Sequence, residues 1–260
     1  MNEKENLLFY SAYEEFYTMA DTSKAFRNFC IDAFGSDFSQ DGFSDKTQID
    51  MILKYIPNAK DVHILDIGCG NGKMLGYLQN KTGAFIHGFD YSEQAIKTAA
   101  KAYTENADFQ EGVIGKIQYP DNLFDLIISM DTIYFSDDIS SFVSDIKKWL
   151  KPDGVFFIGY QEGDVMSKTE CAETTAIARA LTENAITYTY TDITFDTYNL
   201  LKRKRQAALA HKAEFEAENN MRWFDLLICQ TECSCCDYDE FSNKMARYIF
   251  IARKKDFGSD

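Results

Sequence analysis

The chain shows two hydrophobic spacings in succession. From residue 1 to residue 56, apolar and aromatic side chains recur every three or four positions, which predicts amphipathic helices. From residue 57 onward, short apolar runs alternate with longer amphipathic stretches, which predicts strands that alternate with helices. The expected strands cover residues 62–68, 85–91, 107–112, 124–130, 154–160, 186–194 and 246–255. The expected helices after residue 57 cover residues 73–81, 92–103, 139–150, 166–184 and 196–235.

Alternation of this kind favours right-handed βαβ units and a mostly parallel sheet with helices on both faces. We therefore expect an α/β fold with a doubly wound sheet. No Ser/Gly-rich linker divides the chain, so we expect one structural unit. Its parts are an N-terminal helical cover (1–56), with Ser44 as the cap of its last helix, and a main domain (57–260) with a helical insertion (196–235). Both helical parts are candidates to cover the sheet edge where a ligand binds.

Composition narrows the classes of partner and location. The 260 residues carry a formal net charge of −14, which disfavours a nucleic-acid partner, and we expect the basic run at 202–205 to be a solvated helix face. No window reaches 18 uninterrupted apolar residues, and the start lacks a basic segment followed by a hydrophobic one. Neither membrane spanning nor secretion is therefore predicted. An odd number of cysteines, seven, favours free thiols in a reducing cytoplasm.

Three glycines at alternate positions, in "LDIGCGNG", follow the first strand of the main domain. Gly68, Gly70 and Gly72 lie where open α/β sheets bind ligands, and the missing Cβ lets a ligand approach the backbone. The alternative for glycines alone is a tight strand-to-helix turn without a ligand. Their spacing, D-x-G-x-G-x-G, differs from the G-x-G-x-x-G of dinucleotide binders.

An acid ends the next strand. A carboxylate at Asp90 is placed to accept hydrogen bonds from both hydroxyls of a ribose, and the ring of Tyr91 can lie against an adenine. A nucleoside without a pyrophosphate therefore fits this sequence better than NAD.

Four motifs in order along the chain carry a family resemblance. "LDIGCGNG", "FDYS", "FDLIISMDTIYFSDD" and "WLKPDGVFFI" resemble the class I S-adenosylmethionine-dependent methyltransferases over about residues 60–160. The chain is most similar to the small-molecule branch that includes ubiquinone/menaquinone C-methyltransferases and glycine/sarcosine N-methyltransferases. The resemblance implies a seven-stranded Rossmann-like sheet whose last strand is antiparallel. It also implies a methyltransferase that converts S-adenosylmethionine to S-adenosylhomocysteine without a metal.

The resemblance also assigns a set of cofactor-binding positions, which are Asp66, Gly68, Cys69, Gly70, Gly72, Asp90, Tyr91, Val113, Ile114 and Met130. One departure concerns the adenine. Family members often have an acid after the third strand, whereas this chain has Gly112, Val113 and Ile114. The adenine would then contact backbone groups and apolar side chains.

For catalysis, the resemblance points to the end of the fourth strand. Tyr134 stands where family members often carry a histidine or another polar residue that faces the acceptor, and Asp131 is three residues earlier. The alternatives are ordinary packing for Tyr134 and a helix cap for Asp131. Tyr17, Tyr160 and Glu162 are the candidate residues of the acceptor pocket. Aromatic rings and acids together would attract a cation, which favours an amine as acceptor.

Several alternatives remain open at this point. Cys229, Cys233, Cys235 and Cys236 form a cluster, but their spacing is unlike paired C-x₂-C zinc ligands, and we expect free thiols. The alternative functions are a non-catalytic S-adenosylmethionine-binding sensor or partner domain, a dinucleotide-dependent dehydrogenase, and a methyltransferase that acts on a protein. The identity of the acceptor and the oligomeric state do not follow from the sequence.

Overall fold

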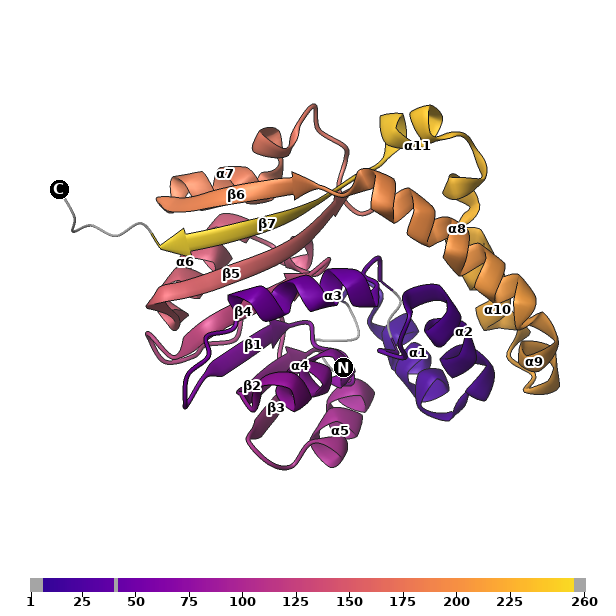
Figure 1. Ribbon diagram of the computed structural model, residues 1–260, viewed down its shortest axis with the longest axis horizontal. Helices are drawn as coiled ribbons and strands as arrows, with labels where there is room; N and C mark the ends of the chain where they lie inside the picture. The colour runs from indigo at the N-terminus through magenta and orange to yellow at the C-terminus, as the bar shows by residue number, and fades with distance from the viewer. Residues whose placement is uncertain (1–6, 40–41, 255–260) are drawn as a thin grey trace.

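The computed structural model describes residues 7–39 and 42–254 (Figure 1). Within these residues one sheet holds seven strands, β1 (His63–Ile67), β2 (Phe85–Asp90), β3 (Ala107–Glu111), β4 (Phe124–Met130), β5 (Leu150–Glu162), β6 (Ile186–Asp192) and β7 (Ala246–Lys254). Their order is β3-β2-β1-β4-β5-β7-β6. β1 to β5 pair in parallel, and β7 runs antiparallel to both of its neighbours. The expected α/β fold with an antiparallel last strand is confirmed.

Helices cover both faces of the sheet because successive strand residues point to opposite sides. Ile64 and Leu126 pack in a core with α3 (Lys46–Ile52) and α4 (Lys73–Thr82), next to α5 (Glu93–Ala102). Leu65 and Ile127 pack on the other face with α6 (Ile139–Trp149) and α7 (Ala176–Glu183). The inner strands β1, β2, β4 and β5 are therefore buried on both sides, as their continuous apolar runs predict, whereas β3 and β6 at the two edges of the sheet are more exposed.

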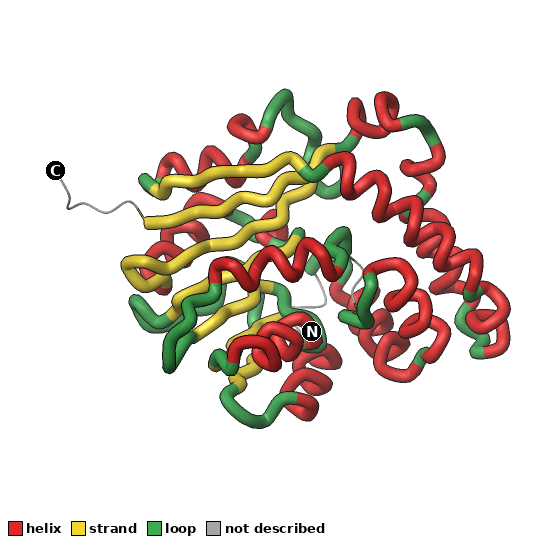
Figure 2. The backbone as a smooth tube through the Cα atoms, viewed as in Figure 1, coloured by secondary structure: helices red, strands yellow, loops and turns green. Residues whose placement is uncertain are grey.

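A second layer of helices, which we call the outer bundle, lies beyond the carboxyl ends of the parallel strands (Figures 1 and 2). It consists of α1 (Tyr10–Thr22), α2 (Lys24–Phe34), α8 (Thr194–Ala210), α9 (Lys212–Ala217) and α10 (Met221–Gln230). These helices share one apolar core, which includes Phe16, Phe26, Phe29, Leu200, Phe224 and Leu227. The N-terminal helices and the helical insertion are therefore packed as one body.

Some local expectations need correction. The cap of α3 is Asp45, whose carboxylate accepts from the backbone N–H of Gln48 (3.1 Å), and not Ser44. The expected helix over 196–235 is three α-helices and a 3₁₀ helix (Glu232–Cys235), with a break at Asn219, which has a φ of +57°. The expected helix over 166–184 begins only at Ala176.

Two further elements differ from the expectation. β5 begins at Leu150, four residues before the expected start at 154. The helix α11 (Tyr238–Lys244) was not expected at all. The last expected strand residue, 255, and residues 1–6 and 40–41 of the expected N-terminal region lie outside the described residues. None of the described helices is both long enough and apolar enough to cross a lipid bilayer.

Candidate functional site

The glycine turn after β1 is held in place by the neighbouring strand. The backbone N–H groups of Gly68 and Cys69 both donate to the Phe89 carbonyl at the end of β2, at 2.9 and 3.0 Å. Gly68 and Gly70 have φ values of +73° and +53°, a region that glycine adopts without strain. A Cβ on Gly68 would lie 2.7 Å from the Thr132 Cγ2 atom, so the turn comes directly against the segment that follows β4.

Two buried carboxylates lie at this turn. Asp90 accepts from the backbone N–H of Gly70 (3.0 Å) and of Ser92 (2.9 Å). Burial raises the pKa of Asp90 to about 6, although these two hydrogen bonds act in the opposite direction. Asp66 is 3 % exposed, and burial together with the charge of Asp90 raises its pKa well above the usual range.

The carboxylate of Asp66 differs from that of Asp90 in its partners. Across residues 7–39 and 42–254 we find no hydrogen bond to the carboxylate of Asp66. A buried carboxylate without a partner is costly, because it loses its hydration without compensation. A cationic group in the pocket would supply that compensation.

Tyrosines of α1 form a wall over the turn. The Tyr17 ring lies against Gly70, so close that a Cβ at that position would overlap its hydroxyl group. The Tyr13 ring stacks on Tyr17 (centroids 6.2 Å apart) and meets the Tyr91 ring edge to face (6.1 Å). The Tyr91 hydroxyl donates to the Leu8 carbonyl oxygen (3.2 Å). The sequence assigned Tyr17 to the acceptor pocket, and the structure places it at the glycine turn.

The segment after β4 carries the two candidate catalytic residues. Tyr134 lies in a short 3₁₀ helix, η3 (Ile133–Phe135), and burial raises its pKa well above 10. Its hydroxyl is therefore neutral. Asp131 has a φ of +58°, and both of its carboxylate oxygens accept from the Arg247 side chain, at 3.0 and 2.7 Å. Both carboxylate oxygens of Asp131 are thus engaged by the Arg247 guanidinium, a bidentate pairing that fixes the orientation of this side chain.

The other two candidates for the acceptor pocket lie elsewhere. Tyr160 is fully buried in the core that β5 shares with α6 and α7, and its ring contacts that of Tyr134 (centroids 5.8 Å apart). Glu162 is buried and accepts from the backbone N–H and the hydroxyl of Thr169, both at 2.9 Å. The structure thus gives Tyr160 a packing role and Glu162 the role of anchoring the loop after β5.

The remaining expected cofactor residues lie near the carboxyl ends of the strands. Cys69 is buried, and burial with the charges of Asp90 and Asp66 raises the pKa of its thiol, so it is no nucleophile. Gly72 has a φ of +76° at the start of α4. The others are Val113 and Ile114, which follow β3 and are half-buried, and Met130, which ends β4.

Sequence reasoning missed two residues that contact this region. Thr132 donates to the Ile67 carbonyl oxygen (2.6 Å) beside the glycine turn. Arg247 is fully buried on β7. An available signal was that Arg247 is in phase with Ile249 and Ile251 on an apolar strand, where a charge requires a buried partner.

The described residues hold no cluster of metal ligands, and the basic run at 202–205 is partly buried. In the part of the chain that the structure describes, no group of three or more His, Cys, Asp or Glu side chains could hold a metal ion. In the basic run, Arg203 pairs with Asp45 (2.5 Å), Arg205 donates to the Ile228 carbonyl oxygen (2.9 Å), and Lys204 is buried. The run is therefore partly internal to the outer bundle and is not a fully solvated face.

The arrangement fits an amino-acid-bearing nucleoside. Asp66 offers an unpaired carboxylate for an ammonium group, and Asp90 offers oxygens for ribose hydroxyls. Tyr91 offers an aromatic face, and Gly68 and Gly70 leave room for close approach to the backbone. The residues present therefore suit the cofactor that the resemblance implies.

Comparison with known proteins agrees with this fit. A family profile described as "Methyltransferase domain" matches residues 65–158. Phosphoethanolamine N-methyltransferase 3 of Arabidopsis thaliana is 34% identical over 130 residues, covering 48% of this chain and 26% of that protein. The Rattus norvegicus protein named Arginine-hydroxylase NDUFAF5 is 32% identical over 110 residues, covering 42% of this chain and 31% of that protein. The chain thus spans about a third or less of these two relatives.

A solved structure extends the likeness of the fold. It is a Haemonchus contortus phosphoethanolamine N-methyltransferase 2 in complex with phosphomonomethylethanolamine and S-adenosylhomocysteine. The TM-score is 0.72 with 19% sequence identity, and the match covers 94% of this chain and 60% of that chain.

Proposed function

Because the chain carries a class I S-adenosylmethionine-dependent methyltransferase domain, as its motifs predict, we propose that the whole protein methylates a small molecule, and that this acceptor is an amine. The observation that supports the pocket's role most directly is the unpaired buried carboxylate of Asp66 beside the glycine turn. A binding site for a cation with a ribose explains why two carboxylates, Asp66 and Asp90, are kept buried there.

When bound, S-adenosylmethionine would supply a sulfonium-activated methyl group for in-line attack by the acceptor's lone pair, with S-adenosylhomocysteine as the leaving group. The chain's own residues would bind and orient the reactants and exclude water. Asp66 would hold the ammonium group of the cofactor, and Asp90 its ribose. Tyr134, neutral at ordinary pH, would orient the acceptor through its hydroxyl or its ring.

The amine acceptor is the finer part of the proposal. The Tyr13 and Tyr17 rings lie over the glycine turn, and Tyr13 is close enough to raise the pKa of Tyr134. Aromatic faces attract cationic groups, so these rings favour an amine acceptor. The relatives named as phosphoethanolamine N-methyltransferases add support, since their names describe an amine acceptor.

We also propose that residues 1–56 and the insertion 196–235 act as the cover of the site. The outer bundle lies beyond the carboxyl ends of the parallel strands (Figure 1). Tyr17 of α1 lies against Gly70, and the carbonyl oxygen of Leu8, two residues before α1, accepts from Tyr91. A cover of this kind would exclude water during transfer.

The test combines binding with a panel of acceptors. We expect S-adenosylhomocysteine to bind in calorimetric titration and NAD to give no heat. The acceptor assay uses S-adenosylmethionine labelled in its methyl group. We expect at least one of four amines to become labelled, namely ethanolamine, phosphoethanolamine, glycine or sarcosine. Phenols and carboxylic acids should stay unlabelled. Asp90→Ala should abolish both binding and labelling.

Other outcomes would select an alternative. Cofactor binding without turnover on any small molecule would favour a sensor domain, and label in a protein fraction would favour a protein substrate. A product labelled on oxygen or carbon would rule out an amine acceptor but would still support methyltransferase activity.

A cytoplasmic location stays a prediction, which rests on the odd number of cysteines.

A further inference from the structure

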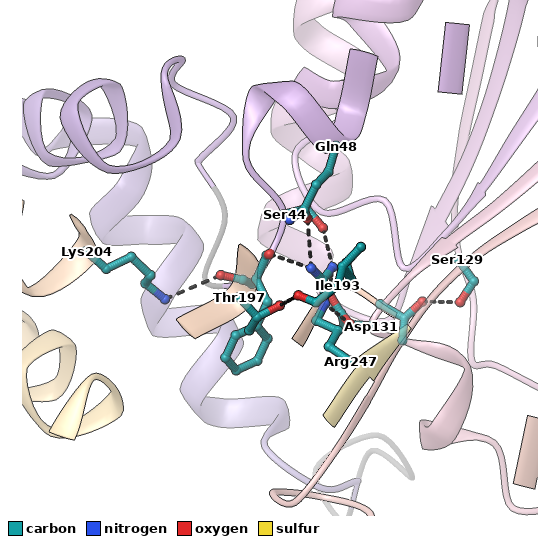
Figure 3. A network of polar contacts seen from close by, with 11 residues as sticks. Ser44, Gln48, Ser129, Asp131, Ile193, Thr197, Lys204 and Arg247 are labelled. Atoms are coloured by element: carbon teal, nitrogen blue, oxygen red, sulfur yellow. Dashed lines mark hydrogen bonds and ion pairs between the residues drawn. The ribbon is translucent and has the colours of Figure 1, made fainter. Parts of the chain in front are cut away.

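Arg247, at the start of β7, is completely buried, and each of its five guanidinium N–H groups has an acceptor (Figure 3). Nε and Nη2 donate to the two carboxylate oxygens of Asp131, at 3.0 and 2.7 Å. The other three donate to the Phe43 carbonyl oxygen, to Gln48 Oε1 and to Ser44 Oγ, each at 2.7 Å. An arginine side chain has five donors, so all of them are used.

On one side, this network reaches the glycine turn. Asp131 begins the segment after β4, and its backbone N–H is fixed on the Gly159 carbonyl oxygen (2.9 Å). The next residue, Thr132, donates to the Ile67 carbonyl oxygen (2.6 Å), and its methyl group lies where a Cβ of Gly68 would be. One residue therefore separates the arginine's partner from the turn that would hold the cofactor.

On the other side, the network reaches both parts of the cover. Ser44 and Gln48 belong to residues 42–48, which we call the α3 entry segment and which link the N-terminal helices to the sheet. The backbone of Arg247 accepts from the Ile193 N–H (2.9 Å) and donates to the Thr194 hydroxyl (3.1 Å), where α8 begins. The insertion and the entry segment thus meet at the same arginine.

A buried ion pair is not the simplest way to stabilise a fold. Apolar residues of similar volume often stabilise a core equally well, because burying two charges costs most of what their attraction gains. What the guanidinium adds is direction, since its planar donors fix several partners in one arrangement. The network of Arg247 is therefore better explained by alignment of its partners than by stability alone.

We propose that Arg247 is a positioning residue, which couples the α3 entry segment and the start of α8 to residues 131–135 and so slows the escape of bound cofactor. This inference rests on the proposed function for the identity of the ligand. The coupling itself is a property of the protein without any ligand. It can therefore be tested in both states.

The main variant is Ser44→Ala/Gln48→Met, which removes two partners on the entry side and leaves the Arg247–Asp131 pair intact. Both side chains accept from Arg247, which in turn binds Asp131, so we expect an effect at residues 131–135 to pass through Arg247. The matched control is Arg253→Met, an exposed arginine on the same strand. The readouts are the dissociation rate of S-adenosylhomocysteine in stopped flow, and hydrogen exchange of the 131–135 amides in the cofactor-free protein.

We expect the double variant to release S-adenosylhomocysteine about tenfold faster, because two hydrogen bonds are lost, and to exchange its 131–135 amides faster. The control should match the wild type in both readouts. A folded double variant with unchanged exchange at 131–135 would overturn the inference. If the wild type binds no S-adenosylhomocysteine, the proposed function fails, while the exchange result still decides whether the coupling exists.

A second variant separates alignment from stability. Arg247→Met alone leaves Asp131 as a buried, unpaired charge and is expected to unfold readily. Arg247→Met/Asp131→Asn removes that charge, and Asn tolerates the left-handed conformation of position 131. The double variant should recover most of the melting temperature but keep the fast release and the fast exchange. Recovery of all three would reduce Arg247 to a structural role.

Discussion

At the scale of single residues, the proposed role of Asp90 predicts cofactor binding that depends on pH. Burial raises its pKa to about 6, and the charge of Glu14 acts in the same direction. In the proposed function the anion accepts hydrogen bonds from ribose hydroxyls, and protonation would remove acceptor capacity. Affinity for S-adenosylhomocysteine should therefore be full above about pH 6 and fall below it, by up to about tenfold per pH unit. Calorimetric titration between pH 5 and pH 8 measures this.

The control for this profile is a second carboxylate. Asp66 also has a raised pKa, so the wild-type curve contains both groups, and Asp66→Asn isolates the part due to Asp90. Burial raises the pKa values of the neighbouring Tyr17, Tyr91 and Cys69, which therefore stay neutral in this range. An affinity that does not change with pH in Asp66→Asn would contradict the role of Asp90.

Tyr134 should matter for turnover and not for cofactor binding. Tyr134→Phe keeps the ring and removes a hydroxyl that stays neutral at ordinary pH. If that hydroxyl orients the acceptor or its proton, kcat should fall by roughly a hundredfold with the affinity for S-adenosylhomocysteine unchanged. The comparison is steady-state kinetics against calorimetry on the same preparation. Equal turnover would remove Tyr134 from the mechanism and leave it as a packing residue.

At the scale of elements, α2 depends on a cap from the insertion. Glu218, just after α9, accepts from the Ser23 hydroxyl (2.6 Å) and from the backbone N–H groups of Lys24 and Ala25 (2.9 and 3.0 Å). Glu218→Ala should lower the free energy of unfolding by about 1–2 kcal/mol in urea denaturation. Glu216→Ala, at an exposed position near the end of α9, is the control, and an equal loss in both variants would argue against the cap.

The same cap has a pH signature. Burial acts to raise the pKa of Glu218, but hydrogen bonds from Ser23 and Ala25 outweigh it, so the pKa is lowered overall. The stabilisation is then present above the unfolded pKa, near 4.5, and is lost as pH falls through the folded value. The difference between wild type and Glu218→Ala should accordingly shrink in acid.

The elements that the sequence predicted well are those whose signals are local. The glycine turn follows β1 directly, Asp90 ends β2, and the alternation of strands and helices is a short-range pattern. The pairing of Arg247 with Asp131 joins positions 116 residues apart, which no periodicity records. For the same reason Ser44 looked like a helix cap, although its hydroxyl accepts from Arg247. Tertiary contacts reassigned residues whose local patterns allowed more than one role.

At the scale of the whole molecule, the two helical segments of the outer bundle should loosen together. Phe29, in α2, is fully buried in the core that α1 and α2 share with α8 and α10. Phe29→Ala should cost about 3–5 kcal/mol of stability. Limited proteolysis should then cut in both 7–34 and 194–230. Phe195→Ala, at a position that is 56 % exposed, is the control. Cleavage confined to the N-terminal helices would show that the two segments open independently.

The shared core of the outer bundle also limits how this architecture can be recombined. A chimera that takes only its first helices from a relative would place foreign side chains against Leu200 and Leu227, and the interface would have to be repacked. A chimera that takes only the insertion would likewise place foreign side chains against α1 and α2. New acceptor preferences should therefore be inherited, or engineered, by exchanging both segments at once, although one lies before β1 and the other between β6 and β7.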